Sequence, residues 1–299
     1  MGCGYPTGPQ LVQDMLDNLV NHAVDLSSRK FMPSNLWDSL NQLVDACKEF
    51  TGALRKAGPM SIDSYIARNP EFDDIGRFAI ALSMLNAEER SGAGGSKAYR
   101  NSMDNWQRVL FDRMFAQYNQ PQLDCLRDSF AKVLTFNYDR SLPVAFNKYL
   151  SANFRSSAVA ERERLLPVLH VYGNVRGDRG VAEYGDAYTF EEVLNTSRSI
   201  QIMHRGQAVA SLELGVRVEA LLRWAQRIFF LGFAFDPFNL DYIKLFRCLK
   251  PAPDAATGHS VFATTYGLPG TVIAGLARQF EAVRASPQFD NGMCSGVLE

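Results

Sequence analysis

The stretch Ile228-Phe-Phe-Leu-Gly-Phe-Ala-Phe235 decides the fold class of this chain. Its apolar run is far too short to cross a bilayer, and a glycine interrupts it, so we expect a buried β-strand over residues 228–231. Helical patterns stand on both sides of this strand, over 212–226 and 240–249. Strands that alternate with helices are typical of a parallel sheet.

The same alternation extends through the second half of the chain. Further strands are predicted over 133–136, within 165–172 and over 260–264. Further helices are predicted over 142–150, 190–194 and 272–280. Residues 131–285, in which strands and helices alternate, are therefore expected to form an α/β fold with a doubly wound, Rossmann-like parallel sheet.

The first half, residues 10–130, is mainly helical by its pattern. Apolar residues at helical spacing predict helices over 12–23, 36–50, 62–68 and 106–115. Ser34 or Asn35 is the expected cap of the second helix, and Ser61 that of the third. The segment 78–85 is too apolar for an exposed helix, and Ser-Gly-Ala-Gly-Gly-Ser over 91–96 is expected to be a loop. We expect this half to be a large helical insertion within a single domain spanning 1–299.

Composition excludes several classes of protein. Lys and Arg number 31 against 32 Asp and Glu, so no general basic surface for nucleic acid is indicated. No apolar run is long enough to span a membrane and no signal peptide is evident, which favours a cytoplasmic protein. The five cysteines are scattered without a C-x-x-C pair, which fits a reducing compartment and predicts no zinc site.

Polar residues and glycines follow each predicted strand. Ligands of parallel sheets bind beyond the carboxyl ends of the strands, so these positions are the candidate site. They are Asn137 and Asp139 after the first strand, His170, Tyr172 and Gly173 at the second, Gly232, Asp236 and Asn239 after the third, and Thr264 at the fourth. Such side chains can bind ribose hydroxyls, an amide or a water molecule.

Structural explanations stand beside this functional interpretation. Asn137 and Asp139 could cap the following helix. His170 could be a core histidine, and its spacing of two from Tyr172 would place both side chains on one face of a strand. Phe233 is expected in the core or in the wall of a pocket.

Several of these segments resemble motifs of the sirtuin-like NAD-binding family. Thr135-Phe-Asn-Tyr-Asp139 resembles its T-x-N-(I/Y)-D motif, and His170-Val-Tyr-Gly-Asn174 resembles the strand end that carries its catalytic H-G. The stretch 228–239 is similar to the G-(F/Y)-x-x-D-P-x-N element of bacterial sirtuin-like effectors. Ser61-Ile-Asp-Ser-Tyr-Ile66 resembles their S-I-D-x-(F/Y)-(I/L) segment, and Gly4-Tyr-Pro-Thr-Gly8 the end of their N-terminal glycine-rich element.

The resemblance implies a sirtuin-type fold and NAD as substrate. It implies that Asn137 holds the ribose and a water molecule, that Asp139 orients this network, and that a histidine at the strand end is the general base. It places Gly232 and Asn239 against the adenosine half of NAD. The remaining positions implied to bind NAD are Gly4, Pro6, Thr135, Gly173, Phe233, Asp236 and Thr264.

The resemblance further implies cleavage of NAD to nicotinamide and ADP-ribose rather than lysine deacetylation, because the four-cysteine zinc module of the deacetylases is absent from the sequence. Bacterial proteins of this branch are effectors of antiphage defence. The implied partner is therefore a sensor chain or further copies of the protein, with no membrane and no nucleic acid involved.

The sequence departs from the family pattern at two places. Tyr172 occupies the position of the family histidine, so either His170 or Tyr172 could serve the catalytic role. The family's first strand and G-A-G-x-S loop would precede Gly4, so we expect an upstream start or a truncated relative. Two alternatives to the hydrolase stay open, a non-catalytic NAD- or ADP-ribose-binding module and a degenerate pseudoenzyme that acts through protein interaction.

Overall fold

The chain forms two compact units, each assembled from three separate segments. The computed structural model describes residues 8–28, 37–58, 61–101, 106–119, 122–123, 129, 131–175, 184–202, 212–251, 258–292 and 294–298. Unit 1 comprises Met1–Ser102, Thr135–Asn147 and His170–Gln207, and unit 2 comprises Met103–Leu134, Lys148–Leu169 and Ala208–Glu299. Both units draw on the helical first half and on the strand-rich second half. The single domain over 1–299 stays a prediction.

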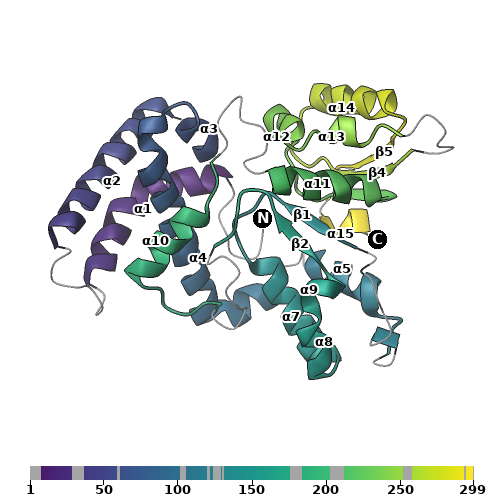
Figure 1. Ribbon diagram of the computed structural model, residues 1–299, viewed down its shortest axis with the longest axis horizontal. Helices are drawn as coiled ribbons and strands as arrows, with labels where there is room; N and C mark the ends of the chain where they lie inside the picture. Colours follow the sequence, from purple (N-terminus) through teal and green to yellow (C-terminus); the bar gives the residue numbers. More distant parts are fainter. Residues whose placement is uncertain are drawn as a thin grey trace. The chain divides into compact units, whose positions relative to one another are not determined.

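Unit 1 is built mainly from helices (Figure 1). They are α1 (Gly8–Ser28), α2 (Trp37–Ala57), α3 (Ile62–Ile66), the short 3-10 helix η2 (Pro70–Phe72), α4 (Asp73–Asn101) and α10 (Phe190–Ser199). Helices α1, α2 and α4 pack against one another, and α10 packs along α4. The rings of Phe78 on α4 and Phe190 on α10 lie 6.5 Å apart. The apolar faces expected from the helical spacing are therefore the surfaces that form this core.

Two local predictions for unit 1 are confirmed. Ser61 caps α3, because its hydroxyl accepts a hydrogen bond from the Ser64 amide at 3.4 Å. Every residue over 78–85 is buried within α4. The proposed caps Ser34 and Asn35 lie outside the described residues, as do Gly4 and Pro6.

The prediction of a loop over residues 91–96 is wrong. Helix α4 continues without a break through this segment to Asn101. Each glycine in a helix costs about 1 kcal/mol relative to alanine. Once a helix has formed its first turns, however, every added residue gains a backbone hydrogen bond, so an established helix extends through weak helix formers.

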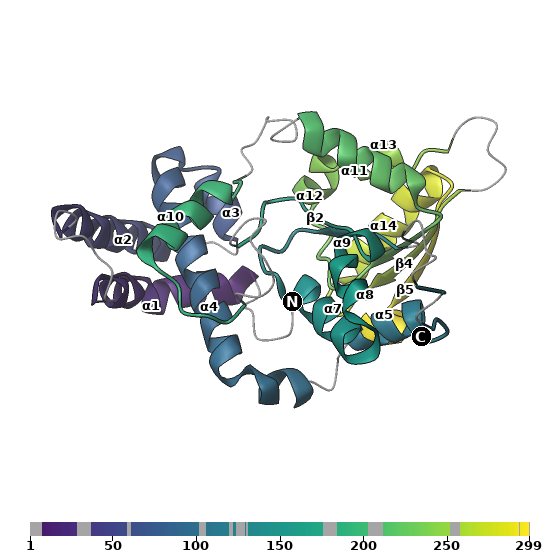
Figure 2. The same ribbon diagram turned by 60° about the horizontal axis from the view of Figure 1, so that its bottom comes forward.

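Within the described residues, five short strands form two sheets. Strands β1 (Val133–Thr135) and β2 (Val168–His170) form a two-stranded sheet. Strands β3 (Arg227–Phe230), β4 (Ser260–Thr264) and β5 (Ser286–Asp290) form a parallel sheet in the order β3-β4-β5, and α14 packs against β5 (Figure 2). The four predicted strands are confirmed, whereas β5 was not predicted. Only the final residues of β1 and β2, Thr135 and His170, belong to unit 1.

Helix α5 (Trp106–Phe115) precedes β1, and further helices follow the strands. They are α7 (Ser141–Asn153), α8 (Ser156–Ala160), α9 (Arg162–Leu165), α11 (Leu212–Trp224), α12 (Pro237–Tyr242), α13 (Leu245–Cys248), α14 (Gly270–Ala282) and α15 (Cys294–Leu298). The single helix predicted over 240–249 is two helices. Lys244 separates them with a left-handed backbone (φ 51°) that an α-helix cannot contain.

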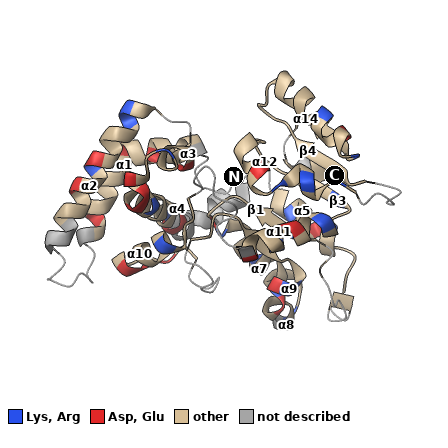
Figure 3. Cartoon of the chain, turned by 45° about the horizontal axis from the view of Figure 1, so that its top comes forward, with Lys and Arg blue, Asp and Glu red and all other residues tan. Residues whose placement is uncertain are grey.

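The fold is thus a largely helical α/β arrangement around small parallel sheets. In the part of the chain that the structure describes, no helix is both long and apolar enough to cross a bilayer. Acidic and basic side chains are interspersed on helices such as α2 and α11 (Figure 3).

Candidate functional site

The loop after β1 carries the first pair of candidate residues. The Asn137 amide donates to Thr135 Oγ1 at 3.1 Å, which folds the chain sharply at the end of the strand. Asp139 is buried, and its carboxylate accepts from the Ser141 amide at 2.9 Å and from the Ser141 hydroxyl. Asp139 therefore caps the start of α7, as the structural explanation of this residue predicted.

His170 lies at the end of β2 and contacts the loop after β1. Its Nδ1 atom is 2.9 Å from the Asn137 carbonyl oxygen. Because a carbonyl oxygen can only accept, Nδ1 carries the proton, and in the neutral form of the ring the lone pair is therefore on Nε2. The His170 ring is half-buried. The structure thus joins two predicted catalytic residues through a contact that sets the tautomer required of a general base.

Tyr172 does not share a strand face with His170, so that prediction is wrong. Strand β2 ends at His170, and Tyr172 lies in the turn that follows. Its ring is buried against Phe136 at 5.4 Å and Tyr138 at 6.1 Å between centroids. Aromatic pairs at this spacing stabilise a core, so Tyr172 is a packing residue at the base of the candidate site.

Gly173 is required by the path of the backbone. Its φ of +77° lies in the left-handed region, and an added Cβ atom would meet the Ser199 carbonyl oxygen at 2.0 Å. The Ser199 hydroxyl in turn donates to the Asn174 carbonyl at 3.0 Å. A side chain at position 173 cannot be placed without moving the backbone. The backbone path alone therefore explains the glycine, and no bound ligand is needed to explain it.

Tyr138 anchors the opposite side of the same loop. It is buried, and its hydroxyl donates to the carboxylate of Asp63 on α3. Burial raises the pKa of Asp63, although the hydrogen bond from Tyr138 lowers it in part. Burial, followed by the Asp63 charge, raises the pKa of Tyr138 well above its ordinary value. Asp63 was noted in the sequence only through its motif, and its contact with the loop of Asn137 was not predicted.

The raised pKa of Asp63 predicts a pH dependence of stability. A carboxyl whose pKa is higher in the folded than in the unfolded protein stabilises the fold while protonated. Its contribution is lost as the pH rises from the ordinary value of 3.8 through the raised folded value. Asp63→Asn cannot ionise and keeps an acceptor for Tyr138. We expect the free energy of unfolding of the variant, relative to the parent, to increase with pH across this window and then level off.

Chemical denaturation between about pH 3 and pH 7 measures this difference. Asp25→Asn on the exposed surface of α1 is the matched control for loss of one carboxylate. If the free energy of unfolding of Asp63→Asn relative to the parent decreased with rising pH, the folded protein would favour the ionised carboxylate, contrary to the prediction.

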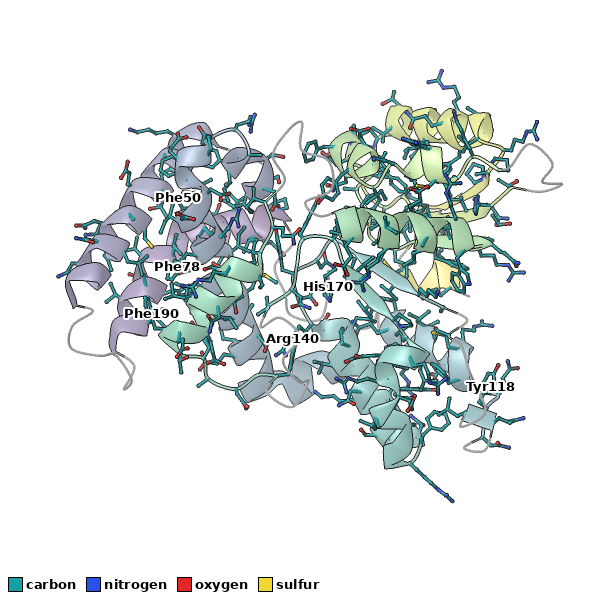
Figure 4. All side chains as sticks on the ribbon, in the orientation of Figure 1. Phe50, Phe78, Tyr118, Arg140, His170 and Phe190 are labelled. Carbon is teal, nitrogen blue, oxygen red and sulfur yellow. The ribbon has the colours of Figure 1, made fainter. Side chains whose placement is uncertain are left out.

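Arg140 fixes the far end of the loop. Its Nη2 atom lies 2.5 Å from Glu88 Oε1 on α4, and the two side chains are 5% and 0% exposed. The structure brings this ion pair together across 52 residues of sequence, and sequence analysis missed it. Figure 4 marks Arg140 and His170 among the side chains. Two anchors, Tyr138 with Asp63 and Arg140 with Glu88, thus alternate along the chain with Asn137 and Asp139.

The remaining candidates gather in unit 2. The Gly232 amide, at a residue with φ +61°, donates to Thr264 Oγ1 at 2.8 Å. Asp236 caps α12 by accepting from the amides of Phe238 at 2.8 Å and Asn239 at 3.4 Å. The Phe233 ring stacks on Phe230 at 5.7 Å. This end of β3 is therefore a second cluster, and each of these contacts also has a structural explanation.

The two units divide the candidate residues between them. Unit 1 contains Thr135, Asn137, Asp139, His170, Tyr172 and Gly173, and unit 2 contains Gly232, Phe233, Asp236, Asn239 and Thr264.

A separate cavity of about 290 Å³ in unit 1 lies between α1 and α2, and no candidate residue lines it. Burial raises the pKa of the Cys47 thiol to about 12, which makes it a poor nucleophile.

The described residues contain no group of three or more His, Cys, Asp or Glu side chains that could hold a metal ion, and the zinc-free site stays a prediction. No family model, curated protein or solved structure matches the chain.

Proposed function

We propose that the protein is an NAD hydrolase that releases nicotinamide and leaves ADP-ribose. The observation that carries the proposal is the 2.9 Å contact between His170 Nδ1 and the Asn137 carbonyl oxygen. The motif resemblance had named both residues, from segments that lie 33 positions apart. Their meeting at the ends of β1 and β2 supports a common site, because ligands bind where parallel strands end.

In the proposed reaction, the bond between nicotinamide and the ribose carbon breaks, and nicotinamide leaves with the bonding electrons. Water adds to the electron-poor carbon, and Nε2 of His170 accepts the proton that the water loses. The Asn137 side chain orients the ribose and the water, and Asp139 supports it indirectly by capping α7.

The proposal includes a sirtuin-type fold in which the strands belong to one doubly wound sheet. It also includes a cytoplasmic role as an antiphage defence effector, activated by a sensor partner or by assembly of several copies. These features rest on the motif resemblance given by residues 135–139, 170–174 and 228–239.

Nicotinamide release from NAD tests the proposal. We expect Asn137→Ala to lower the rate by about 100-fold or more, because substrate orientation is lost. Asn153→Ala, at an exposed position in the last turn of α7, is the matched control and should retain the parent rate. Equal rates for parent and Asn137→Ala would contradict the proposal.

The second candidate is a module that binds NAD or ADP-ribose without turnover. The observation that favours it is Tyr172, which occupies the family's histidine position and is buried against Phe136 and Tyr138. Calorimetric titration with ADP-ribose separates the two functions. Binding without nicotinamide release would establish the module, and absence of both would favour a pseudoenzyme.

A further inference from the structure

Helices α1 and α2 lie side by side in unit 1, and the open cavity of about 290 Å³ lies between them (Figure 2). Asp17 and Asn21 line this cavity from α1, and Lys48, Gly52 and Arg55 line it from α2. Ligand pockets commonly measure about 300–1,000 Å³, so a cavity of this size suits a small molecule. None of its lining residues belongs to the candidate site at the ends of β1 and β2.

Gly52 provides the space in this cavity. It lies in the interior of α2, where a glycine destabilises the helix relative to alanine. A Cβ atom added at Gly52 would meet no heavy atom within 4 Å, whereas one added at Gly76 on α4 would meet Ile66 Cδ1 at 2.4 Å. Helix packing therefore requires the glycine at position 76 but not the glycine at position 52. What the missing side chain of Gly52 provides is room between the helices.

Opposite charges face this room without pairing. Arg55 donates from Nη2 to the Leu16 carbonyl oxygen at 2.8 Å, which holds its guanidinium beside α1. Asp17 is the next residue of α1 and lines the same cavity. Within the described residues, however, no ion pair joins Arg55 to Asp17 or to any other carboxylate. A molecule that carries both a carboxylate and an ammonium group would satisfy both side chains.

Two more side chains can turn to a ligand at little cost. Lys48 Nζ lies 2.8 Å from Asp45 Oδ1, but these side chains are 59% and 73% exposed. Exposed ion pairs contribute little to stability, so Lys48 can exchange Asp45 for a ligand carboxylate. The exposed Asn21 side chain makes no hydrogen bond with the described part of the chain, so its amide is available as donor and acceptor.

We propose that the cavity between α1 and α2 binds a small amino dicarboxylate, the class of molecule to which glutamate and aspartate belong. The charged lining consists of two cations and one anion, which two carboxylates and one ammonium group complement. Arg55 binds the first carboxylate through two parallel hydrogen bonds, and Lys48 binds the second as a point charge. Asp17 accepts from the ammonium group. This binding site is independent of the proposed reaction.

Calorimetric titration of the full chain with L-glutamate tests the proposal. We expect saturable binding, and we expect glutarate and L-glutamine to bind about tenfold or more weakly, because each lacks one of the charged groups. Glutarate lacks the ammonium group, and L-glutamine lacks the second carboxylate. Equal affinity for the three molecules would overturn the proposal, as would the absence of saturable heat with L-glutamate up to about 10 mM.

Gly52→Leu places a side chain in the cavity. We expect it to weaken L-glutamate binding by about tenfold or more, while the midpoint of thermal unfolding stays the same or rises, because leucine favours the helix. The matched control is Gly275→Leu on α14, where an added Cβ atom also meets no heavy atom within 4 Å. This control should bind L-glutamate with the parent affinity, because position 275 does not line the cavity.

Arg55→Gln tests the site without filling it, so the proposal can still be contradicted if Gly52→Leu does not fold. The glutamine amide keeps a donor for the Leu16 carbonyl but loses the charge, and we expect binding to weaken by about tenfold or more. Parent affinity in either folded variant would overturn the proposal. Selective L-glutamate binding that Gly275→Leu keeps, and that the folded cavity variants lose, establishes the site.

Discussion

Arg140→Leu is expected to lower the free energy of unfolding by about 3–5 kcal/mol, because it removes the guanidinium partner of a completely buried carboxylate. Glu88 is 0% exposed and Arg140 is 5% exposed, and their closest nitrogen and oxygen atoms are 2.5 Å apart. A carboxyl group buried this deeply cannot be solvated by water in place of the guanidinium that the variant lacks. Urea denaturation of parent and variant measures the change.

Two further variants show whether burial causes the effect. Arg90→Leu removes an arginine of the same helix α4 that is 60% exposed and 3.9 Å from Asp14, and it should cost less than about 1 kcal/mol. The double variant Glu88→Leu/Arg140→Met should recover most of the loss, because well-packed apolar residues can replace a buried pair. A similar cost for Arg90→Leu and Arg140→Leu would show that the buried pair contributes no more than an exposed one.

The second large effect concerns His170. We expect His170→Asn to reduce nicotinamide release by about 10²–10⁴-fold, the usual contribution of a general base. The asparagine amide nitrogen can occupy the place of Nδ1 and still donate to the Asn137 carbonyl, which is 2.9 Å away in the parent. The substitution thus removes the base at Nε2 and preserves the contact that positions the loop. Single-turnover kinetics on NAD measure the loss.

Tyr172→Phe separates the two candidate bases. It keeps the ring that packs on Phe136 and Tyr138 and removes only the hydroxyl. We expect this variant to retain most of its activity. An inactive Tyr172→Phe beside an active His170→Asn would transfer the catalytic role to Tyr172. His170→Ala completes the series, because a further loss beyond that of His170→Asn measures the positioning contact.

Local sequence patterns predicted the elements that have a clear periodicity. Apolar runs marked β1 to β4, and helical spacing marked α1, α2 and α5. Strand β5 was missed because Ser286-Pro-Gln-Phe-Asp290 has no apolar run and contains a proline. An edge strand tolerates proline, since one side of its backbone has no partner within the sheet.

The candidate site was predictable only in part. The loop after a strand is a local feature, so Asn137, Asp139 and His170 could be selected from the sequence. The contacts that hold that loop join Asp63 to Tyr138 across 75 residues and Glu88 to Arg140 across 52. Such pairs leave no periodic signal, because neither partner's position constrains the residues near the other in sequence.

By itself, the sequence determined the mixed α/β character of the fold, most of the elements and the strand ends at which polar residues collect, because these depend on neighbours along the chain. Only the tertiary structure decided that Tyr172 packs in the core and that Asp139 caps α7. It also decided that β1 and β3 remain sheet edges. Burial, partner choice and strand pairing are set by residues distant in sequence, and their free energies exist only once the chain has folded.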